Sequence, residues 1–233
     1  MYIYGKNVAR EKISSKDKIR KAYISDNFKD KDIINKLRDN KVKINFVNNK
    51  ELDRKVDGLH QGIVLEIDDI KTYDLDEIVD NIDKEYPLLV MLDHLEDPHN
   101  FGAIIRTCEA LGIDGIIIPN DRSVNINGTV VKTSVGAIEY VPIIRVPNLN
   151  TTIKKIKDKG YWIVGTDMSS TDYRTIDYKV PICLVIGNEG KGISKIVRDN
   201  CDYIATIPMI GKINSLNASV SCGIILSHIV GDR

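Results

Sequence analysis

The sequence is poor in the features that define several large classes of protein. Its 233 residues include only four cysteines, with no CxxC pair and no neighbouring histidine: Cys108, Cys183, Cys201 and Cys222. This spacing argues against a disulfide framework or zinc site and predicts free, buried thiols in a reducing compartment. Residues 1–6 contain no signal-peptide hydrophobic region, and no apolar run is long enough to cross a membrane. We therefore expect a cytoplasmic protein with no membrane partner.

Common nucleotide-binding and catalytic fingerprints are also missing. Neither GxxxxGK[ST] nor GxGxxG occurs, so a nucleoside triphosphatase or a nicotinamide-dependent dehydrogenase is not indicated. The four histidines, at positions 60, 94, 99 and 228, show no metal-ligand spacing, and no metal is expected. No serine or cysteine nucleophile has an evident histidine partner. If the chain is an enzyme, its chemistry must come from another kind of site.

The formal net charge is zero, but the charges are unevenly distributed. Residues 1–66 contain 16 Lys and Arg against 10 Asp and Glu, whereas residues 67–99 contain 2 against 11. A basic N-terminal region is compatible with a polyanionic partner, although solvated charged helices would give the same count. Charge alone leaves both interpretations open.

The N-terminal part has the pattern of a small α/β unit. Short β-rich runs at 21–25, 43–47 and 62–67 predict strands, and an amphipathic run at 32–40 predicts a helix after a helical start. The acidic stretch 68–86 carries apolar residues spaced for one connecting helix. The sequence thus predicts a domain boundary near residues 68–86.

From Pro87 onward the pattern predicts a parallel sheet covered on both faces. Nearly continuous apolar runs predict strands at 88–92, 115–118, 141–144, 162–165, 182–186 and 203–207. Helical patterns separate several of them, at 103–111, 151–159 and 193–199.

Polar segments follow two of these strands, and a third precedes the last helix. They span Leu92–Gly102, Val185–Gly192 and Ile213–Ser221, the third close behind Ile207 and Pro208. Ligands of open α/β sheets bind outside the carboxyl ends of the strands, and polar residues at a helix start leave backbone N–H groups free. We therefore expect the three segments to form one site.

Each candidate residue has an ordinary structural alternative. Arg106 can face the strand ends and hold a phosphate, or it can pair with Glu109 or the acidic stretch. The glycine-rich run around Glu189 can approach a ligand closely or form a simple strand-to-helix turn. Ser215 and Asn217 can be helix caps and nothing more. From the residues alone, these alternatives stay open.

Three stretches resemble a known family. They are DPHNFGAIIRTCEALG (97–112), LVIGNEGKGIS (184–194) and IPMIGKINSLNASVSCGIIL (207–226), which resemble, in order, the three motifs of the SpoU (TrmH-type) RNA ribose 2'-O-methyltransferases. Residues 59–63, LHQGI, resemble the end of the L30e-like RNA-binding domain that precedes the catalytic domain in many members. Within the family, the chain is most similar to enzymes that methylate a guanosine in large-subunit ribosomal RNA.

The resemblance implies a fold that periodicity would not have indicated. It predicts a SPOUT-type parallel-sheet domain with a deep trefoil knot at 87–233, an acidic linker at 68–86 and an L30e-like RNA-binding domain at 1–67. Since knots are rare, the apolar pattern alone would suggest an ordinary doubly wound sheet. A homodimer is also implied by the resemblance, with no surface assigned to it.

The resemblance also implies a cofactor and a set of site residues. The cofactor is S-adenosylmethionine (SAM), with binding positions at Thr166, Gly187, Ile207, Leu216 and Asn217. The catalytic positions fall on Asn100, Arg106, Glu189, Ser215 and Asn217. We expect Arg106 and Asn100 to hold the target ribose and its phosphate, with Glu189 orienting one of them.

RNA contact is expected from basic residues of the N-terminal domain: Lys6, Arg10, Lys18, Arg20 and Lys21. Two other functions are compatible with the motifs, namely a tRNA 2'-O-methyltransferase of the same fold and a noncatalytic RNA-binding protein. The joint presence of Asn100, Arg106, Glu189 and Asn217 argues against the noncatalytic alternative.

Overall fold

The computed structural model describes residues 1–14, 18–212 and 215–233 and divides the chain into two compact units. Unit 1 comprises residues 1–70 and 126–137, and unit 2 comprises residues 71–125 and 138–233. This division differs from the expected domains, 1–67 and 87–233 with a linker at 68–86. Most of the acidic stretch packs into unit 2, and a segment from the middle of the chain joins unit 1.

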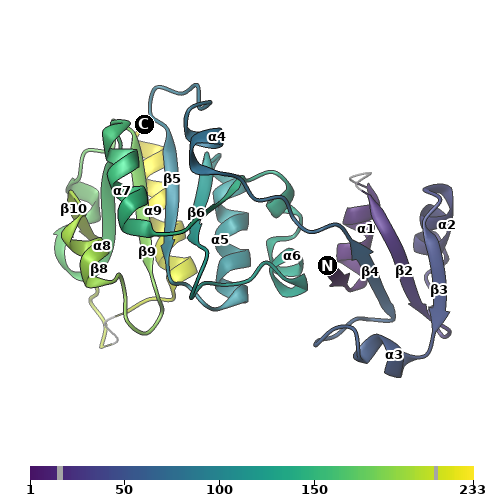
Figure 1. The fold of residues 1–233 in the computed structure, drawn as a ribbon. Helices are drawn as coiled ribbons and strands as arrows, with labels where there is room; N and C mark the ends of the chain where they lie inside the picture. The colour runs from purple at the N-terminus through teal and green to yellow at the C-terminus, as the bar shows by residue number, and fades with distance from the viewer. Residues whose placement is uncertain (15–17, 213–214) are drawn as a thin grey trace. The chain divides into compact units, whose positions relative to one another are not determined.

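Unit 1 is built on a mixed four-stranded sheet with strand order β1-β4-β2-β3 (Figure 1). Its strands are β1 (Tyr2–Tyr4), β2 (Ile19–Ser25), β3 (Lys43–Val47) and β4 (Ile63–Ile67). Its helices are α1 (Lys6–Ser14), α2 (Lys31–Asp39), α3 (Asn49–Asp53) and α6 (Gly128–Ser134). The predicted strands at β2, β3 and β4 and the helix α2 are confirmed, whereas β1, α3 and α6 were not predicted.

Helices α1 and α2 cover one face of this sheet. Strand register places Ile3, Leu65 and Ala22 side by side, and all three side chains are buried. Helix α1 contributes Ile13 to this core, and α2 contributes Ile33. Burial of aliphatic side chains between helices and sheet stabilises the unit.

The short helix α6 packs against the β1 edge of unit 1. A Cβ at Gly128 would approach the Tyr2 carbonyl oxygen to 2.6 Å, so only glycine fits there. The Tyr4 hydroxyl lies 3.3 Å from the Thr129 hydroxyl, and Val130 is fully buried. These contacts explain why a segment predicted to belong to the second domain groups with the first.

Unit 2 contains a parallel six-stranded sheet with strand order β10-β8-β9-β5-β6-β7. The strands are β5 (Leu88–Asp93), β6 (Gly115–Pro119), β7 (Ile143–Val146), β8 (Trp162–Asp172), β9 (Ile182–Gly187) and β10 (Tyr203–Thr206). All six correspond to predicted strands, although β8 continues well beyond its apolar start. Tyr73 adds an isolated parallel bridge to Ile144 at the β7 edge.

Helices cover both faces of the unit 2 sheet (Figure 1). The longer helices are α5 (Pro98–Ala110), α7 (Leu149–Asp158) and α9 (Ala218–Asp232), and the shorter ones are α4 (Leu75–Val79), α8 (Lys195–Asp199) and the 3-10 turns η1 (Ala137–Glu139) and η2 (Tyr173–Thr175). Helices α4, α7 and α8 share a core with one face of the sheet. Helices α5 and α9 contact each other, and α9 also contacts β9. The predicted α/β fold with a doubly covered parallel sheet is confirmed, while the trefoil knot stays a prediction from the resemblance.

No helix in the described ranges is long and apolar enough to cross a membrane.

Candidate functional site

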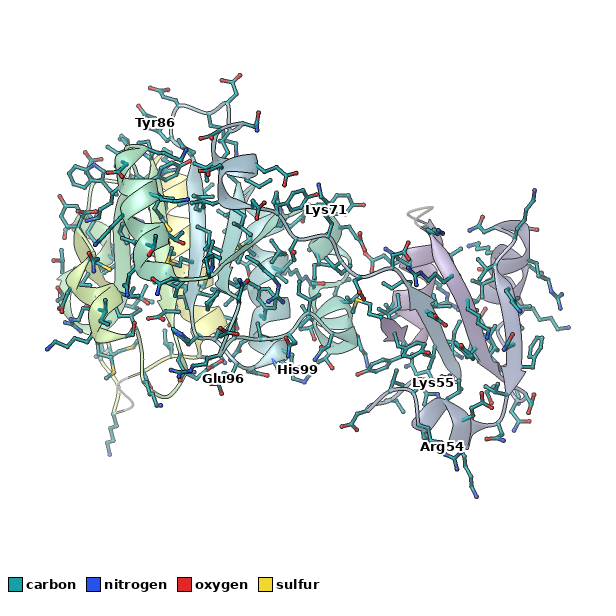
Figure 2. The ribbon with its side chains drawn as sticks, viewed as in Figure 1. Arg54, Lys55, Lys71, Tyr86, Glu96 and His99 are labelled. Atoms are coloured by element: carbon teal, nitrogen blue, oxygen red, sulfur yellow. The ribbon has the colours of Figure 1, made fainter. Side chains whose placement is uncertain are left out.

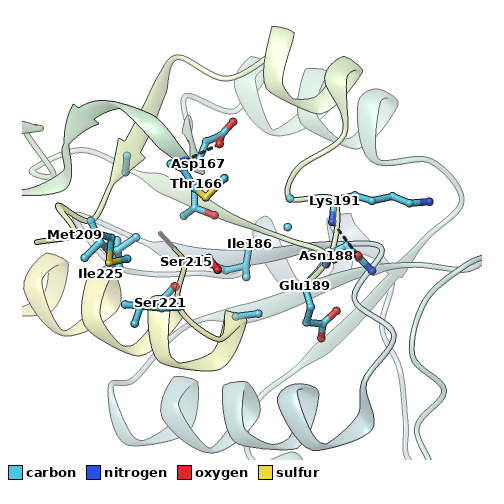
Figure 3. A pocket seen from close by; sticks show the side chains of 18 residues that line it. Thr166, Asp167, Ile186, Asn188, Glu189, Lys191, Met209, Ser215, Ser221 and Ile225 are labelled. Atoms are coloured by element: carbon cyan, nitrogen blue, oxygen red, sulfur yellow. Dashed lines mark hydrogen bonds between the residues drawn. The ribbon is translucent and has the colours of Figure 1, made fainter. Parts of the chain in front are cut away.

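A pocket of about 300 Å³ in unit 2 is lined by residues of the second and third polar segments (Figure 3), and the first segment adjoins it through the hydrogen bond between Asn100 and Glu189. Strands β8, β9 and β5 are neighbours in the sheet, and all three run in the same direction. Their carboxyl-terminal ends therefore open on one edge, which is where ligands of such sheets bind. The prediction that the segments share one site agrees with this geometry.

The pocket lining is part apolar and part polar. Apolar side chains come from β9, α9 and the segment before α9: Ile186, Ile225, Ile207, Met209 and Leu216. Hydroxyl and carboxylate groups come from Thr166, Ser215, Ser221, Asp167 and Glu189. A pocket of this size with a few convergent polar groups is typical of small-molecule sites.

The turn after β9 folds back tightly on the strand end. Asn188 and Gly192 exchange two backbone hydrogen bonds, of 3.0 and 2.9 Å. A Cβ at Gly187 would lie 2.2 Å from the Gly192 carbonyl carbon, so a side chain there would collide with backbone. Asn188 fixes the turn by accepting from the Gly190 N–H and donating to the His94 carbonyl oxygen, both at 2.9 Å. The turn thereby presents Glu189 at the pocket.

A chain of side-chain hydrogen bonds joins the three predicted motifs. Asn100 Nδ2 donates to Glu189 Oε1 at 2.8 Å, and Asn217 Nδ2 donates to Asn100 Oδ1 at 2.8 Å. Asn100 is 7% exposed, so both ends of its amide need such partners. The Asn100 side chain thus binds Glu189, which is 89 positions away in the sequence, and Asn217, which is 117 positions away.

Helix caps place two members of this chain. Asp97 accepts from the N–H groups of His99 and Asn100 and begins α5. Asn217 accepts from the N–H groups of Ser219 and Val220 and begins α9. Asn217 is therefore both a helix cap and a partner of Asn100, so it is more than a cap, while its role in binding a ligand stays a prediction.

Arg106 lies apart from this network. Its side chain is exposed on α5, and it forms no hydrogen bond or ion pair with the residues that the structure describes. The alternative that Arg106 pairs with Glu109 or the acidic stretch is therefore not seen. Glu189 orients Asn100 and not Arg106, so the guanidinium is free to take an external anion.

The predicted cofactor residues Thr166, Gly187, Ile207 and Leu216 line the pocket, as does the predicted catalytic residue Ser215. Asn217 adjoins it without lining it. Two residues of the third motif, Ile213 and Asn214, lie outside the described part of the chain.

Sequence reasoning missed other lining residues, among them Asp167, Ser221 and Ile225. Asp167 directly follows Thr166 and forms an ion pair with Arg198 of α8. Ser221 and Ile225 follow Asn217 at intervals of four residues, which places all three on one helix face. That spacing was the signal that could have found them.

The predicted RNA-binding residues are spread over unit 1. Arg10 pairs with Asp30 at 2.6 Å, and Arg20 pairs with Asp68. Lys6 lies over the Phe28 ring and Lys21 over the Tyr23 ring. Lys18 is exposed. The role of these residues in RNA binding stays a prediction.

The thiols are unsuited to nucleophilic chemistry. Cys108 and Cys183 are fully buried, and burial raises the pKa of both above the usual range. Burial also raises the pKa of Cys201 to about 11. A thiol reacts as its thiolate, so these three are nearly inert at neutral pH. Within the described ranges, no three His, Cys, Asp or Glu residues are grouped to hold a metal ion.

Comparisons with known proteins place this geometry in a family. Residues 87–227 match the SpoU rRNA Methylase family, and residues 2–73 match a family described as RNA 2'-O ribose methyltransferase substrate binding. The chain is 40% identical over 238 residues to YacO of Bacillus subtilis (strain 168), which is assigned to the TrmH family of tRNA/rRNA methyltransferases. That match covers 100% of this chain and 96% of YacO.

Two solved structures are also similar. An AdoMet-bound rRNA methyltransferase from Sinorhizobium meliloti is 26% identical, with a TM-score of 0.76 over 98% of this chain and 85% of that chain. A TrmH/SpoU tRNA modifying enzyme from A. aeolicus is 34% identical, with a TM-score of 0.59 over 64% of this chain and 77% of that one. The expected family and enzyme class are confirmed: the chain belongs to the SpoU family of SAM-dependent RNA methyltransferases.

Proposed function

We propose that this protein transfers a methyl group from SAM to the ribose 2'-hydroxyl of a guanosine in large-subunit ribosomal RNA. The observation that carries the chemistry is the hydrogen-bond chain from Glu189 through Asn100 to Asn217 beside the pocket. Likeness to the S. meliloti rRNA methyltransferase over 98% of this chain, against 64% for the A. aeolicus tRNA enzyme, favours ribosomal RNA.

The pocket residues fit SAM. Apolar side chains such as Ile186 and Ile225 suit the adenine ring, and the hydroxyls of Thr166 and Ser215 suit its polar groups. The Glu189 carboxylate suits a cofactor that carries positive charge, whereas the Asp167 carboxylate is already paired with Arg198. The backbone at Gly187, Ile207 and Leu216, together with Thr166, would hold the cofactor, which when bound supplies the electrophilic methyl group.

Methyl transfer to a hydroxyl is an in-line displacement, so the protein must align the ribose oxygen with the methyl group. Alignment of this kind can supply several kcal/mol of barrier lowering. Asn100 is buried and bonded on both sides, so we assign it as a positioning residue that fixes Glu189 and the start of α9. This revises the expectation that Asn100 itself holds the ribose.

Arg106 is assigned to the RNA. Its exposed guanidinium has no partner among the described side chains, and its planar fork of donors matches a phosphate. A guanidinium stays protonated at neutral pH and cannot accept the hydroxyl proton in that form. A substrate phosphate held by Arg106 is the easier acceptor.

We further propose that the protein acts as a homodimer. Helix α9 exposes Val220 at 48% and Val230 at 39%, and apolar side chains on an exposed helix face suit burial against a second copy. Light scattering after gel filtration tests this, and a monomer at micromolar concentration would contradict it. A cytoplasmic location stays a prediction.

The deciding experiment is transfer of labelled methyl from SAM to unmodified large-subunit rRNA and, in parallel, to unmodified bulk tRNA. Alkali-resistant linkages then map the product. Label confined to one rRNA guanosine supports the full proposal. Label in tRNA alone keeps the chemistry and overturns the substrate. Absence of label in both RNAs, with SAM binding intact, overturns catalysis on free RNA.

A further inference from the structure

The face of the unit 1 sheet opposite α1 and α2 carries three lysines. Strand register places Lys21 of β2 between Glu66 of β4 and Lys43 of β3. Lys55, labelled in Figure 2, directly follows Arg54 at the end of α3. Its ammonium group lies over the ring of Tyr23, which is on the same face of the sheet. This set of Lys21, Lys43 and Lys55 is called the lysine face.

Two of these ammonium groups are held in place by aromatic rings. Lys55 Nζ lies 4.0 Å and Lys21 Nζ 4.9 Å from the centre of the Tyr23 ring, so the two cations are no further apart than the sum of these distances. Lys55 Nζ also lies 5.3 Å from the Tyr2 ring centre. Cation–π contacts hold the long side chains near the sheet without neutralising their charge.

The lysine face has more cations than carboxylates. Glu66 is the one acidic side chain in the row of Lys21 and Lys43, and it accepts a hydrogen bond of 3.1 Å from the Tyr23 hydroxyl. Among the residues that the structure describes, no lysine of the face forms an ion pair. By contrast, Arg10 and Arg20 of the same unit are paired with Asp30 and Asp68.

Lys21 and Lys43 lie directly opposite each other on neighbouring strands, where like charges are destabilising. Glu66, opposite Lys21 on the other side, offsets only part of this repulsion. An anion bound to the face would remove this repulsion. A row of phosphates is an anion of suitable extent, and residues 2–73 match the family described as RNA substrate binding.

We propose that the lysine face binds the phosphate backbone of the RNA substrate. This inference rests on the proposed function and names the surface through which unit 1 acts. Tyr23 is 7% exposed beneath its lysines, so it does not serve as a stacking platform for bases. The contacts are therefore electrostatic, independent of base sequence and sensitive to salt.

The test compares two charge-matched triple variants of the full chain. The first carries Lys21→Gln, Lys43→Gln and Lys55→Gln. The control carries Lys29→Gln, Lys31→Gln and Lys41→Gln, three exposed lysines elsewhere in unit 1. A third protein, with Lys21, Lys43 and Lys55 changed to Arg, keeps the charge. Filter binding to transcribed large-subunit rRNA is measured between about 50 and 200 mM salt.

We expect the lysine-face variant to bind rRNA roughly tenfold or more weakly at about 100 mM salt, with a salt slope smaller by about two to three. The control should lose less than about threefold, the arginine protein should bind like wild type, and SAM affinity should be unchanged in all. Equal losses in the two glutamine variants would overturn the inference. If wild type neither binds nor methylates rRNA, the proposed function fails instead.

Discussion

The two sheets of this protein differ in how much of their surface is left open to bind a ligand. In unit 2, every residue of β5, β6 and β9 is buried, because helices cover both faces of the sheet. In unit 1, β3 has no buried residue, and the face opposite α1 and α2 is covered only in part, by a small core of Tyr4, Tyr23, Val64 and Leu52. A sheet buried on both faces can offer chemistry only at its strand ends, whereas a partly covered face can itself offer a surface. The cofactor pocket and the lysine face follow this difference.

The largest expected effect comes from a change on α5 of unit 2. Arg106→Ala should lower turnover by roughly 100-fold or more, because the phosphate loses its clamp and the ribose its alignment. SAM affinity by calorimetry and rRNA affinity through unit 1 should change little. Arg106→Lys keeps the positive charge but loses the planar guanidinium, so its turnover should lie between those of wild type and Arg106→Ala.

The matched control is Arg174→Ala, which removes an exposed arginine of unit 2 that is paired with Asp172. It should leave turnover unchanged. Wild-type turnover in Arg106→Ala would show that this residue takes no part in the mechanism.

A smaller loss of turnover is expected when Asn100, which joins the three motifs by hydrogen bonds, is replaced by a carboxylate. Asn100→Asp should place a carboxylate oxygen about 2.8 Å from Glu189 Oε1 in place of the donor. Two carboxylates so close cannot both ionise, so the pKa of one must rise. Turnover should fall roughly tenfold at pH 8 and recover partly as the pH decreases and the pair takes up a proton.

The pH profile separates this positioning role from general damage. Asn100→Ala lacks the carboxylate and should lose activity without recovering it at lower pH. Parallel profiles for the two variants would contradict the assignment.

The next prediction concerns the stability of unit 2 alone. The Arg233 guanidinium donates to the carbonyl oxygens of Tyr178, Tyr86 and Val180 at 2.9, 2.5 and 2.9 Å. Arg233→Gln should lower the free energy of unfolding by about 2–4 kcal/mol in urea titrations, because charged hydrogen bonds to partly buried acceptors are lost. Arg174→Gln should cost less than about 1 kcal/mol, since its ion pair is exposed. Equal urea midpoints of unfolding for the two variants would rule out a stabilising role for the Arg233 hydrogen bonds.

The smallest expected effect is a change in the rate of thiol labelling, which probes unit 2 in the unsubstituted protein. All four cysteines lie in unit 2, where Cys108, Cys183 and Cys222 are fully buried and Cys201 is half-buried. Thiol labelling at pH 8 should be slow in the native protein and reach four equivalents in denaturant. SAM should slow it further, because binding stabilises the unit that holds the pocket. Rapid native labelling of more than one thiol would contradict the burial of these side chains.

The comparison also changes how the units can be separated. The sequence predicted a separate N-terminal domain at residues 1–67, with a boundary near residues 68–86. However, α6, far along the chain, packs on β1, and its Val130 is fully buried. Deletion would expose this helix, so point variants on the lysine face are the sounder probe.

Local patterns predicted the elements that tertiary contacts only reinforce. Runs such as Leu88–Leu92 and Ile182–Ile186 gave strands, because uninterrupted apolar stretches suit a sheet buried on both faces. Helix α6 was missed, since GTVVKTS is short and rich in β-branched residues that do not favour a helix by themselves. Packing against unit 1 stabilises it where propensity does not.

The sequence by itself determined most of the strands, the longer helices, the three motifs and the residue types available to the site. The tertiary structure decided that Glu189 fixes Asn100, that Asn100 holds Asn217, and that Arg106 has no partner among the described residues. It also decided that Lys21 joins Lys43 and Lys55, while Arg10 and Arg20 are paired elsewhere. The physical reason is range: helix and strand patterns are written in neighbouring residues, whereas these partners lie far apart in the chain and meet only through sheet order and register.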